Sequence, residues 1–350
     1  MSMYEHRHVK ADGRELFLYG RRRPSVDILT NEPANELQSQ VCFSHLRWHP
    51  LREEWVVYAA QRQARTFLPQ AHECPLCVSG GGYLSEVPFE DFEVAVFENR
   101  FPAFSSQAEM PSVLHGIQVG AAKGRCEVIV YSPRHDAGMA MLDDERLALL
   151  IEVWGARVGA MRKMGLSSVL PFENRGEEIG VTLHHPHGQI YGFSFIPNQL
   201  QKSADAQARS PVIANLIDEL DEGLIIQQSK KALSFVPPFA MYPYEIWIAP
   251  RHRVSSPEDL DAEQRMEMAQ CLGDAMRRLD GLFGVPMPYI LIVQCAPKGY
   301  EDSFHMTIEI RPFRRDAGKL KFLAGVEQGA GVFLVDVLPD VAAYKLREVV

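Results

Sequence analysis

The stretch His184-His185-Pro186-His187-Gly188-Gln189-Ile190 restricts the fold and function of this chain most strongly. It leads into a β-rich run from Ile190 to Ile196. Residues two apart on a strand point to the same face, so His185, His187 and Gln189 are expected to project together. Two imidazoles and an amide on a buried strand are costly unless they bind or react with something. The pattern therefore predicts a functional site at the head of this strand.

His187 is the best candidate for a nucleophile. A neutral imidazole nitrogen attacks phosphorus well when its other nitrogen is held by an acceptor. Attack by histidine implies a phosphoramidate intermediate and a double displacement. Gln189 can donate a hydrogen bond to a phosphoryl oxygen but cannot act as an acid or base at neutral pH. The alternative for His187 is a structural histidine with satisfied hydrogen bonds.

The chain repeats its own order of elements. The repeat pairs the runs 127–135 and 245–252, the helix-like segments 143–164 and 258–282, the β-rich runs 167–172 and 288–295, and the motifs His185-Pro-His187 and His305-Met-Thr307. The offsets are 117 and 120 positions, and matches in the same order indicate a duplication. The second copy has Thr307 where the first has His187, so the chemistry is expected in the first half.

Strand-rich runs with a helix between them predict an α+β fold, with a mostly antiparallel sheet and helices packed on one side. The expected organisation has three parts. Residues 1–42 form a charged and irregular N-terminal extension, residues 43–200 the catalytic half, and residues 201–350 a second half without the nucleophile. The segments 78–84 and 102–114 are expected to be loops.

Cys74-Pro-Leu-Cys77 is a C-x-x-C pair, which can be a redox motif or half of a zinc site. Zinc needs two further ligands, and His135 and His185 are the best candidates because each follows or begins a β-rich run. Two free cysteines without a metal are the alternative. Because iron also accepts such ligands, the residue types leave the metal open.

Three polar residues are candidate phosphate or sugar ligands. Arg62 and Arg65 could hold phosphate groups through their guanidinium forks, or form an ordinary surface pair. Asn174 could bond a phosphate or sugar oxygen, or simply form a turn close to Gly176.

The composition is ordinary for a globular enzyme, with 46% hydrophobic and 23% charged residues. A net charge of -9 argues against a general nucleic-acid binder. Residues 1–25 lack the apolar segment of a signal peptide, and no apolar run approaches the roughly 20 residues that span a bilayer. The six cysteines are Cys42, Cys74, Cys77, Cys126, Cys271 and Cys295. They do not suggest a disulfide scaffold, so we expect a cytoplasmic protein without a membrane or nucleic-acid partner.

Phe172-Glu173-Asn174-Arg175-Gly176 followed by His185-Pro186-His187-Gly188-Gln189 resembles the signature of the galactose-1-phosphate uridylyltransferase family, in the histidine-triad superfamily. The resemblance begins near residue 43, covers nearly all of the remaining chain, and implies two histidine-triad-like halves. It also implies a ping-pong reaction of galactose metabolism. UDP-glucose gives its uridylyl group to His187 and releases glucose 1-phosphate, and galactose 1-phosphate then takes the group to form UDP-galactose.

The resemblance also implies roles for individual residues. His187 matches the nucleophile and Gln189 its phosphoryl-binding partner, while Cys74, Cys77, His135 and His185 match the ligands of one structural zinc. The implied substrate-binding residues are Arg62, Arg65, Asn99, Asn174, Thr182, Lys321, Phe322 and Glu327. In some relatives the last three bind the hexose phosphate across a dimer interface, so a homodimer is expected.

Some family members bind a second metal, but Ser203 and Thr307 stand at two of the matching positions and only His305 is retained. We therefore predict no second metal. His184 has no family counterpart and is expected to be structural or solvent-facing. Two other functions remain open: a phosphorylase of the same superfamily acting on an ADP-sugar or dinucleoside polyphosphate, and a non-catalytic, zinc-stabilised nucleotide-binding protein.

Overall fold

A computed structural model describes residues 2–25, 44–80 and 83–349. Its main feature is a large sheet in which all neighbouring strands run antiparallel. Among the described residues the sheet has 11 strands. Their spatial order is β1 (Tyr4–Val9), β2 (Glu15–Gly20), β5 (Val94–Glu98), β7 (Gly124–Val130), β9 (His187–Phe193), β8 (Ser168–Arg175), β13 (Tyr289–Gln294), β14 (Thr307–Pro312), β12 (Ile246–Pro250), β11 (Ala232–Phe235) and β10 (Ile225–Gln228). The predicted α+β class with a mostly antiparallel sheet is confirmed.

The predicted duplication is visible in the order of the strands. β8 and β13, which are equivalent in the two copies, pair at the centre of the sheet, and the other equivalent strands follow outward on either side. Phe172 pairs with Ile292, which lies 120 positions further along the chain and is its counterpart in the repeat. The two halves are therefore related by an approximate two-fold axis through the β8–β13 pair.

Two long helices, α1 (Asp144–Lys163) and α4 (Ala262–Gly281), pack alongside each other and share one hydrophobic core with the sheet. An aspartate precedes each helix, Asp143 before α1 and Asp261 before α4. Its side chain accepts a hydrogen bond from a backbone N–H in the first turn of the helix. The short helix α3 (Val212–Asp218) packs with β11 and β12 in a separate cluster. Successive residues of β11 point to opposite faces of the sheet: Ala232 packs in the core with α4, and Leu233 packs in the cluster with α3. The helix α3 therefore covers the face opposite α4.

The prediction that residues 1–42 are irregular is wrong for residues 4–20. These residues form the hairpin β1–β2, and β2 pairs with β5. Leu16, Leu18 and Tyr19 are fully buried, so β2 is part of the core. The apolar residues of β2 alternate between the two faces of the sheet, and both faces are buried, which explains the strand. The charged residues of the segment lie mainly on β1 and in the turn. Cys42 lies outside the described residues.

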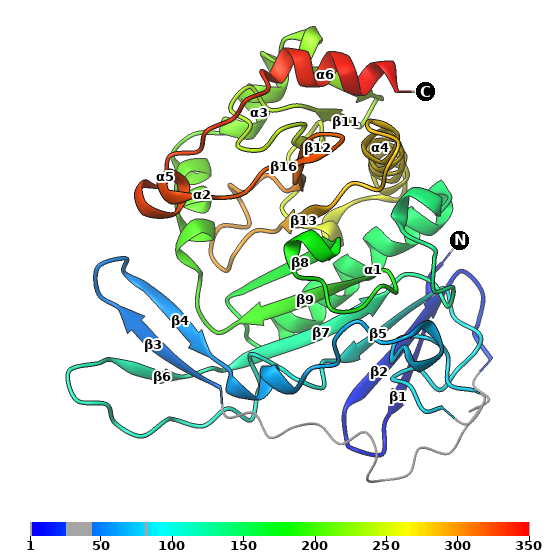
Figure 1. Ribbon diagram of the computed structural model, residues 1–350, viewed down its shortest axis with the longest axis vertical. Helices are drawn as coiled ribbons and strands as arrows, with labels where there is room; N and C mark the ends of the chain where they lie inside the picture. Colours follow the sequence, from blue (N-terminus) through cyan, green and yellow to red (C-terminus); the bar gives the residue numbers. More distant parts are fainter. Residues whose placement is uncertain (1, 26–43, 81–82, 350) are drawn as a thin grey trace.

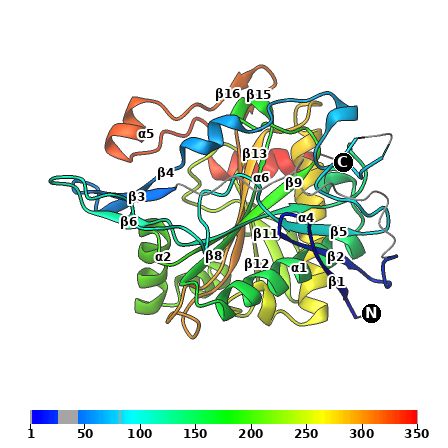
Figure 2. The same cartoon turned by 90° about the horizontal axis from the view of Figure 1, so that it is seen from below.

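A smaller sheet, with β4 (Glu54–Tyr58), β3 (His45–His49) and β6 (Val119–Ala121), projects sideways from the large one in both views (Figures 1 and 2). The N-terminal hairpin and the C-terminal helix lie at opposite ends of the molecule (Figure 1). The remaining α-helices are α2 (Asn198–Arg209), α5 (Gly325–Ala330) and α6 (Pro339–Glu348), and the remaining strands are β15 (Arg314–Asp316) and β16 (Lys319–Leu320). Of the described helices, none has the length and apolar character needed to cross a membrane.

Candidate active site

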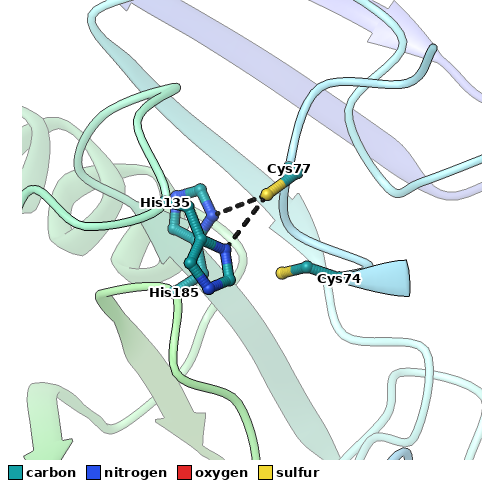
Figure 3. A group of neighbouring side chains, drawn as sticks. All are labelled: Cys74, Cys77, His135 and His185. Atoms are coloured by element: carbon teal, nitrogen blue, oxygen red, sulfur yellow. Dashed lines mark hydrogen bonds between the residues drawn. The ribbon is translucent and has the colours of Figure 1, made fainter. Parts of the chain in front are cut away.

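Two cysteines and two histidines from separate parts of the chain meet beside the large sheet (Figure 3). Cys74 and Cys77 lie on the loop between β4 and β5, His135 follows β7, and His185 precedes β9. The loop is held against the sheet because Cys74 and Leu76 are buried in a cluster with residues of β2, β5 and β7. The four residues that the C-x-x-C motif and its expected partners predicted therefore come together.

The donor atoms of this cluster fit a metal ion. All four lie within 4.8 Å of one another. The sulfur of Cys77 is 3.2 Å from His135 Nδ1 and 3.4 Å from His185 Nδ1. Zinc–sulfur and zinc–nitrogen bonds of about 2.3 and 2.0 Å at a tetrahedral angle place such atoms roughly 3.5 Å apart. His185 Nε2 lies 2.9 Å from the Ser132 carbonyl, which can only accept, so Nδ1 is free to bind a metal. The cluster is compatible with one zinc site.

Half-buried and buried residues alternate along β9, and His187 and Gln189 both lie on its half-buried face. Both border a pocket, here called the first pocket. It is lined by Arg65, Thr66, Pro75, Leu76, Glu86, Phe97, Asn99, Arg100, Phe101, Val128, Thr182, Leu183, His187 and Gln189. Five of the predicted site residues are thus brought together: Arg65, Asn99, Thr182, His187 and Gln189. His185 does not project with them, since β9 begins only at His187 and the His185 ring turns into the cysteine cluster.

The tautomer of His187 is set by the backbone. Its Nδ1 lies 2.8 Å from the carbonyl oxygen of His185, which accepts only, so Nδ1 carries the proton and Nε2 keeps its lone pair. Burial lowers the pKa of His187, which favours the neutral ring. His185 therefore contributes twice, with its ring to the cysteine cluster and with its carbonyl to His187.

His187 also borders a second pocket, of about 530 Å³. Asn174 and Arg175, at the end of β8, line it. Arg175 donates to Asp280 at 2.7 Å. The β8 strand that ends in this segment pairs with β9, with Phe172 opposite Gln189.

Four predicted substrate-binding residues line neither pocket. Arg62 Nη1 donates instead to the Phe101 carbonyl at 3.0 Å and to the Tyr191 hydroxyl at 3.1 Å. Lys321 and Glu327 form a buried ion pair of 2.5 Å with each other. Phe322 is 67% exposed. Within this chain Lys321 and Glu327 therefore bind each other, and Phe322 faces solvent.

His184 and His305, singled out in the sequence, also have defined places. The side chain of His184 is half exposed and lies 3.4 Å from a carboxylate oxygen of Glu177, as expected of a solvent-facing residue. His305 Nε2 lies 2.8 Å from the Pro250 carbonyl, which repeats the contact between His185 and Ser132 in the first half.

Arg100 borders the first pocket and was not predicted. Its Nε is buried and has no hydrogen-bond partner among the described residues. A buried guanidinium N–H without a partner is costly, so a cation at the wall of a pocket is suited to an anionic ligand. Arg100 directly follows Asn99, a predicted site residue, and this position could have indicated it. An arginine before an aromatic residue is, however, too common a pattern to be specific.

Glu173 is buried and borders the second pocket. The Tyr289 hydroxyl donates to its carboxylate at 3.1 Å. Burial raises the pKa of Glu173 to about 7, although Arg175 and the Tyr289 hydrogen bond act in the opposite direction. The hydroxyl of Tyr131 also faces the carboxyl. A Cβ at Gly188 would collide with this hydroxyl, which explains the glycine of the motif.

We expect Glu173→Gln to change how stability depends on pH. Between about pH 4.5 and 7 the folded protein holds a proton that the unfolded chain releases, so the free energy of unfolding falls as the pH rises through this window. The neutral amide removes this term. Above pH 7 it should raise the free energy of unfolding by roughly 3 kcal/mol. Urea denaturation at pH 5 and pH 8 measures the difference, with the exposed Glu90→Gln as control. Parallel pH profiles for wild type and Glu173→Gln would contradict the assignment.

Comparison with known proteins agrees with this geometry. A family model described as "Galactose-1-phosphate uridyl transferase, N-terminal domain" matches residues 34–197, and the corresponding C-terminal domain model matches residues 198–350. A galactose-1-phosphate uridylyltransferase from Streptomyces lividans is 34% identical over 97% of this chain and 96% of its own length. The enzyme of the same name from Thermotoga maritima is 33% identical, over 87% and 98% respectively.

A solved structure of a uridylyltransferase superposes with a TM-score of 0.77 at 26% identity, covering 87% of this chain and 97% of that one. An ADP-glucose phosphorylase from Arabidopsis thaliana shares the fold, with a TM-score of 0.67 at 22% identity. The duplicated fold and the His-Pro-His-Gly-Gln strand define a protein of the uridylyltransferase class. The matches along both halves make the assignment narrower: the chain belongs to the galactose-1-phosphate uridylyltransferase family.

Proposed function

We propose that this protein transfers the uridylyl group of UDP-glucose to galactose 1-phosphate through a covalent intermediate on His187. The observation that carries the proposal is the position of His187. It borders both pockets, and the His185 carbonyl fixes its tautomer so that Nε2 is the nucleophilic nitrogen. A nucleophile shared by two pockets suits a reaction in which two substrates exchange one group.

In the first step, Nε2 attacks the α-phosphorus of UDP-glucose. A nitrogen–phosphorus bond forms while the bond to the bridging oxygen breaks, and glucose 1-phosphate leaves. In the second step, a phosphate oxygen of galactose 1-phosphate attacks the same phosphorus, and His187 is released. The role of the surrounding residues is positioning and charge stabilisation.

The two pockets divide the substrates between them. The first pocket combines the apolar side chains of Leu76, Phe97 and Phe101 with the cations Arg65 and Arg100, which suits a base attached to phosphates. The second pocket offers polar groups at the end of β8 to a sugar phosphate. Gln189, beside His187, is assigned to hold a phosphoryl oxygen.

We assign the cysteine–histidine cluster to one structural zinc ion. Four protein ligands leave no open position for water, so the metal would supply rigidity rather than chemistry. It would tie the Cys74–Cys77 loop to the segment that precedes β9 and so support the wall of the first pocket. The cytoplasmic location and the homodimer, with Lys321, Phe322 and Glu327 reaching a neighbouring subunit's hexose, stay predictions.

The test is the intact mass of the protein after brief incubation with UDP-glucose and no acceptor. We expect a gain of one uridylyl group, lost again when galactose 1-phosphate is added. A gain with an ADP-sugar or a dinucleoside polyphosphate, but none with UDP-glucose, would favour the phosphorylase. No gain with any donor would refute the covalent mechanism and leave a nucleotide-binding protein.

Arg100→Ala should weaken binding of the nucleotide substrate. Loss of a hydrogen bond from a charged donor costs about 1.5–3 kcal/mol, which predicts a KM for UDP-glucose raised roughly 10- to 100-fold. Steady-state kinetics measures this change. The control is Arg22→Ala, because the Arg22 side chain is exposed and lies far along the chain from both pockets. An unchanged KM would mean that Arg100 does not face the substrate.

A further inference from the structure

A chain of hydrogen bonds runs behind the first pocket and ends at Gln189. Arg62 Nη1 donates to the Tyr191 hydroxyl at 3.1 Å, and the Tyr191 hydroxyl donates to Gln189 Oε1 at 3.2 Å. Arg62 is itself anchored by the Phe101 carbonyl at 3.0 Å. Neither Arg62 nor Tyr191 lines the pocket, so their connection to the site passes through the glutamine.

The direction of these bonds follows from the chemistry of the groups. A guanidinium can only donate, so the oxygen of Tyr191 accepts from Arg62. The hydroxyl has one proton, and burial raises the pKa of Tyr191 to about 12, so this proton stays in place. Gln189 Oε1 is its strong acceptor; the sulfur of Cys126, on the neighbouring strand, is a weak one.

The oxygen of the Gln189 amide is thereby turned towards Tyr191, and its NH₂ group points the other way. Among the described residues, that NH₂ group has no protein acceptor. Left to itself, an amide side chain can rotate by half a turn and exchange donor for acceptor. An acceptor facing a phosphoryl oxygen would repel it, whereas a donor stabilises it.

We propose that Arg62 and Tyr191 are positioning residues that hold Gln189 as a hydrogen-bond donor to the phosphoryl group. This inference rests on the proposed function and reassigns Arg62, which the sequence suggested as a direct phosphate ligand. Tyr191 is suited to the task because its ring is fixed by aromatic neighbours. The ring centroids of Phe172, Phe104 and Phe193 lie 5.1, 6.2 and 6.4 Å from its own.

Tyr191→Phe tests the proposal, because it removes the hydroxyl and keeps the packed ring. We expect uridylylation of His187 to slow about tenfold, as for one lost hydrogen bond. Gln189→Ala should slow it on the order of 100-fold, as for loss of a donor to the developing charge. The decisive variant is the double substitution. If Tyr191 acts through Gln189, the double variant reacts no more slowly than the Gln189→Ala variant alone.

Effects that multiply in the double variant would overturn the proposal, as would a Tyr191→Phe protein with the wild-type rate. Tyr244→Phe is the matched control, since Tyr244 is buried in the second half and its hydroxyl accepts a 3.4 Å bond from Lys345. It should leave the rate unchanged.

The same double-mutant cycle can be measured as binding affinity, by calorimetry with uridine monophosphate, whose phosphate should contact Gln189. We expect Tyr191→Phe to weaken binding in the wild-type background and not in Gln189→Ala. If wild type forms no uridylyl adduct, the proposed function fails, while this binding cycle still decides the role of Tyr191. If wild type does not bind uridine monophosphate at all, both proposals are overturned.

Discussion

His187→Ala is expected to abolish uridylyl transfer and the covalent adduct while leaving nucleotide binding nearly intact. Removal of a nucleophile costs on the order of 10⁴-fold or more in kcat, because the remaining groups can position the substrates but cannot form the intermediate. Binding should survive, since Arg65, Arg100 and the apolar wall of the first pocket remain. Two measurements check this: intact mass after incubation with UDP-glucose, and calorimetric binding of uridine monophosphate.

The comparison that makes this result specific is His115→Ala. His115 is an exposed histidine in the loop before β6, and its replacement should leave both the adduct and the rate unchanged. An adduct of normal yield in His187→Ala would move the nucleophile elsewhere. Loss of both the adduct and binding would instead mean that the imidazole supports the pocket. The substitution His187→Gln, which keeps a polar side chain but removes the nucleophile, would then distinguish a structural role from a nucleophilic one.

The second large effect is expected from Cys74→Ala combined with Cys77→Ala. Two of four ligands are removed, so the bound metal should fall from one ion per chain to none. Structural zinc sites contribute many kcal/mol to folding, and the loss should lower the melting temperature by on the order of 10 °C. Transfer should weaken as well, because the Cys74–Cys77 loop supplies Leu76 to the first pocket and the His185 carbonyl holds His187.

Metal analysis, thermal denaturation and the rate of adduct formation report these three effects. Cys271→Ala is the matched control, since Cys271 is a free, buried thiol in α4 far along the chain from the cluster. It should keep the metal and the rate, and lose only the small stability of a shortened core side chain. A double variant that retains one metal ion per chain would refute the assignment of the cluster.

The motifs were informative because they combine residue types that are costly to bury without a task. His185, His187 and Gln189 pointed to the site, and Cys74 with Cys77 required partners that the chain could supply in only a few places. The structure brings the four expected ligands together. The internal repeat likewise predicted duplicated halves. In the structure equivalent segments adopt equivalent strands, and Phe172 pairs with its counterpart Ile292.

Other features could not be predicted from the sequence, because they depend on contacts between distant segments. The N-terminal hairpin was read as irregular from its charges, although Leu16 and Leu18 are buried against β5. Arg62 and Arg65 are three positions apart and look equivalent in the sequence. In the fold only Arg65 reaches the pocket, because Arg62 is held by Phe101 and Tyr191.

The sequence by itself determined the class of fold, the duplication, the family and the kinds of atoms available for chemistry. The class of fold, the duplication and the kinds of atoms follow from local periodicity and from residue types, and the family follows from the resemblance carried by the motifs 172–176 and 185–189. All of these are properties of short segments. The tertiary structure alone decided that His187 borders two pockets, that Arg100 faces one of them, and that Tyr191 connects Arg62 to Gln189. Such relations are set by strand register and by the packing of segments that are distant in the sequence. The direction of a hydrogen bond is defined only once its atoms are within about 3 Å of one another.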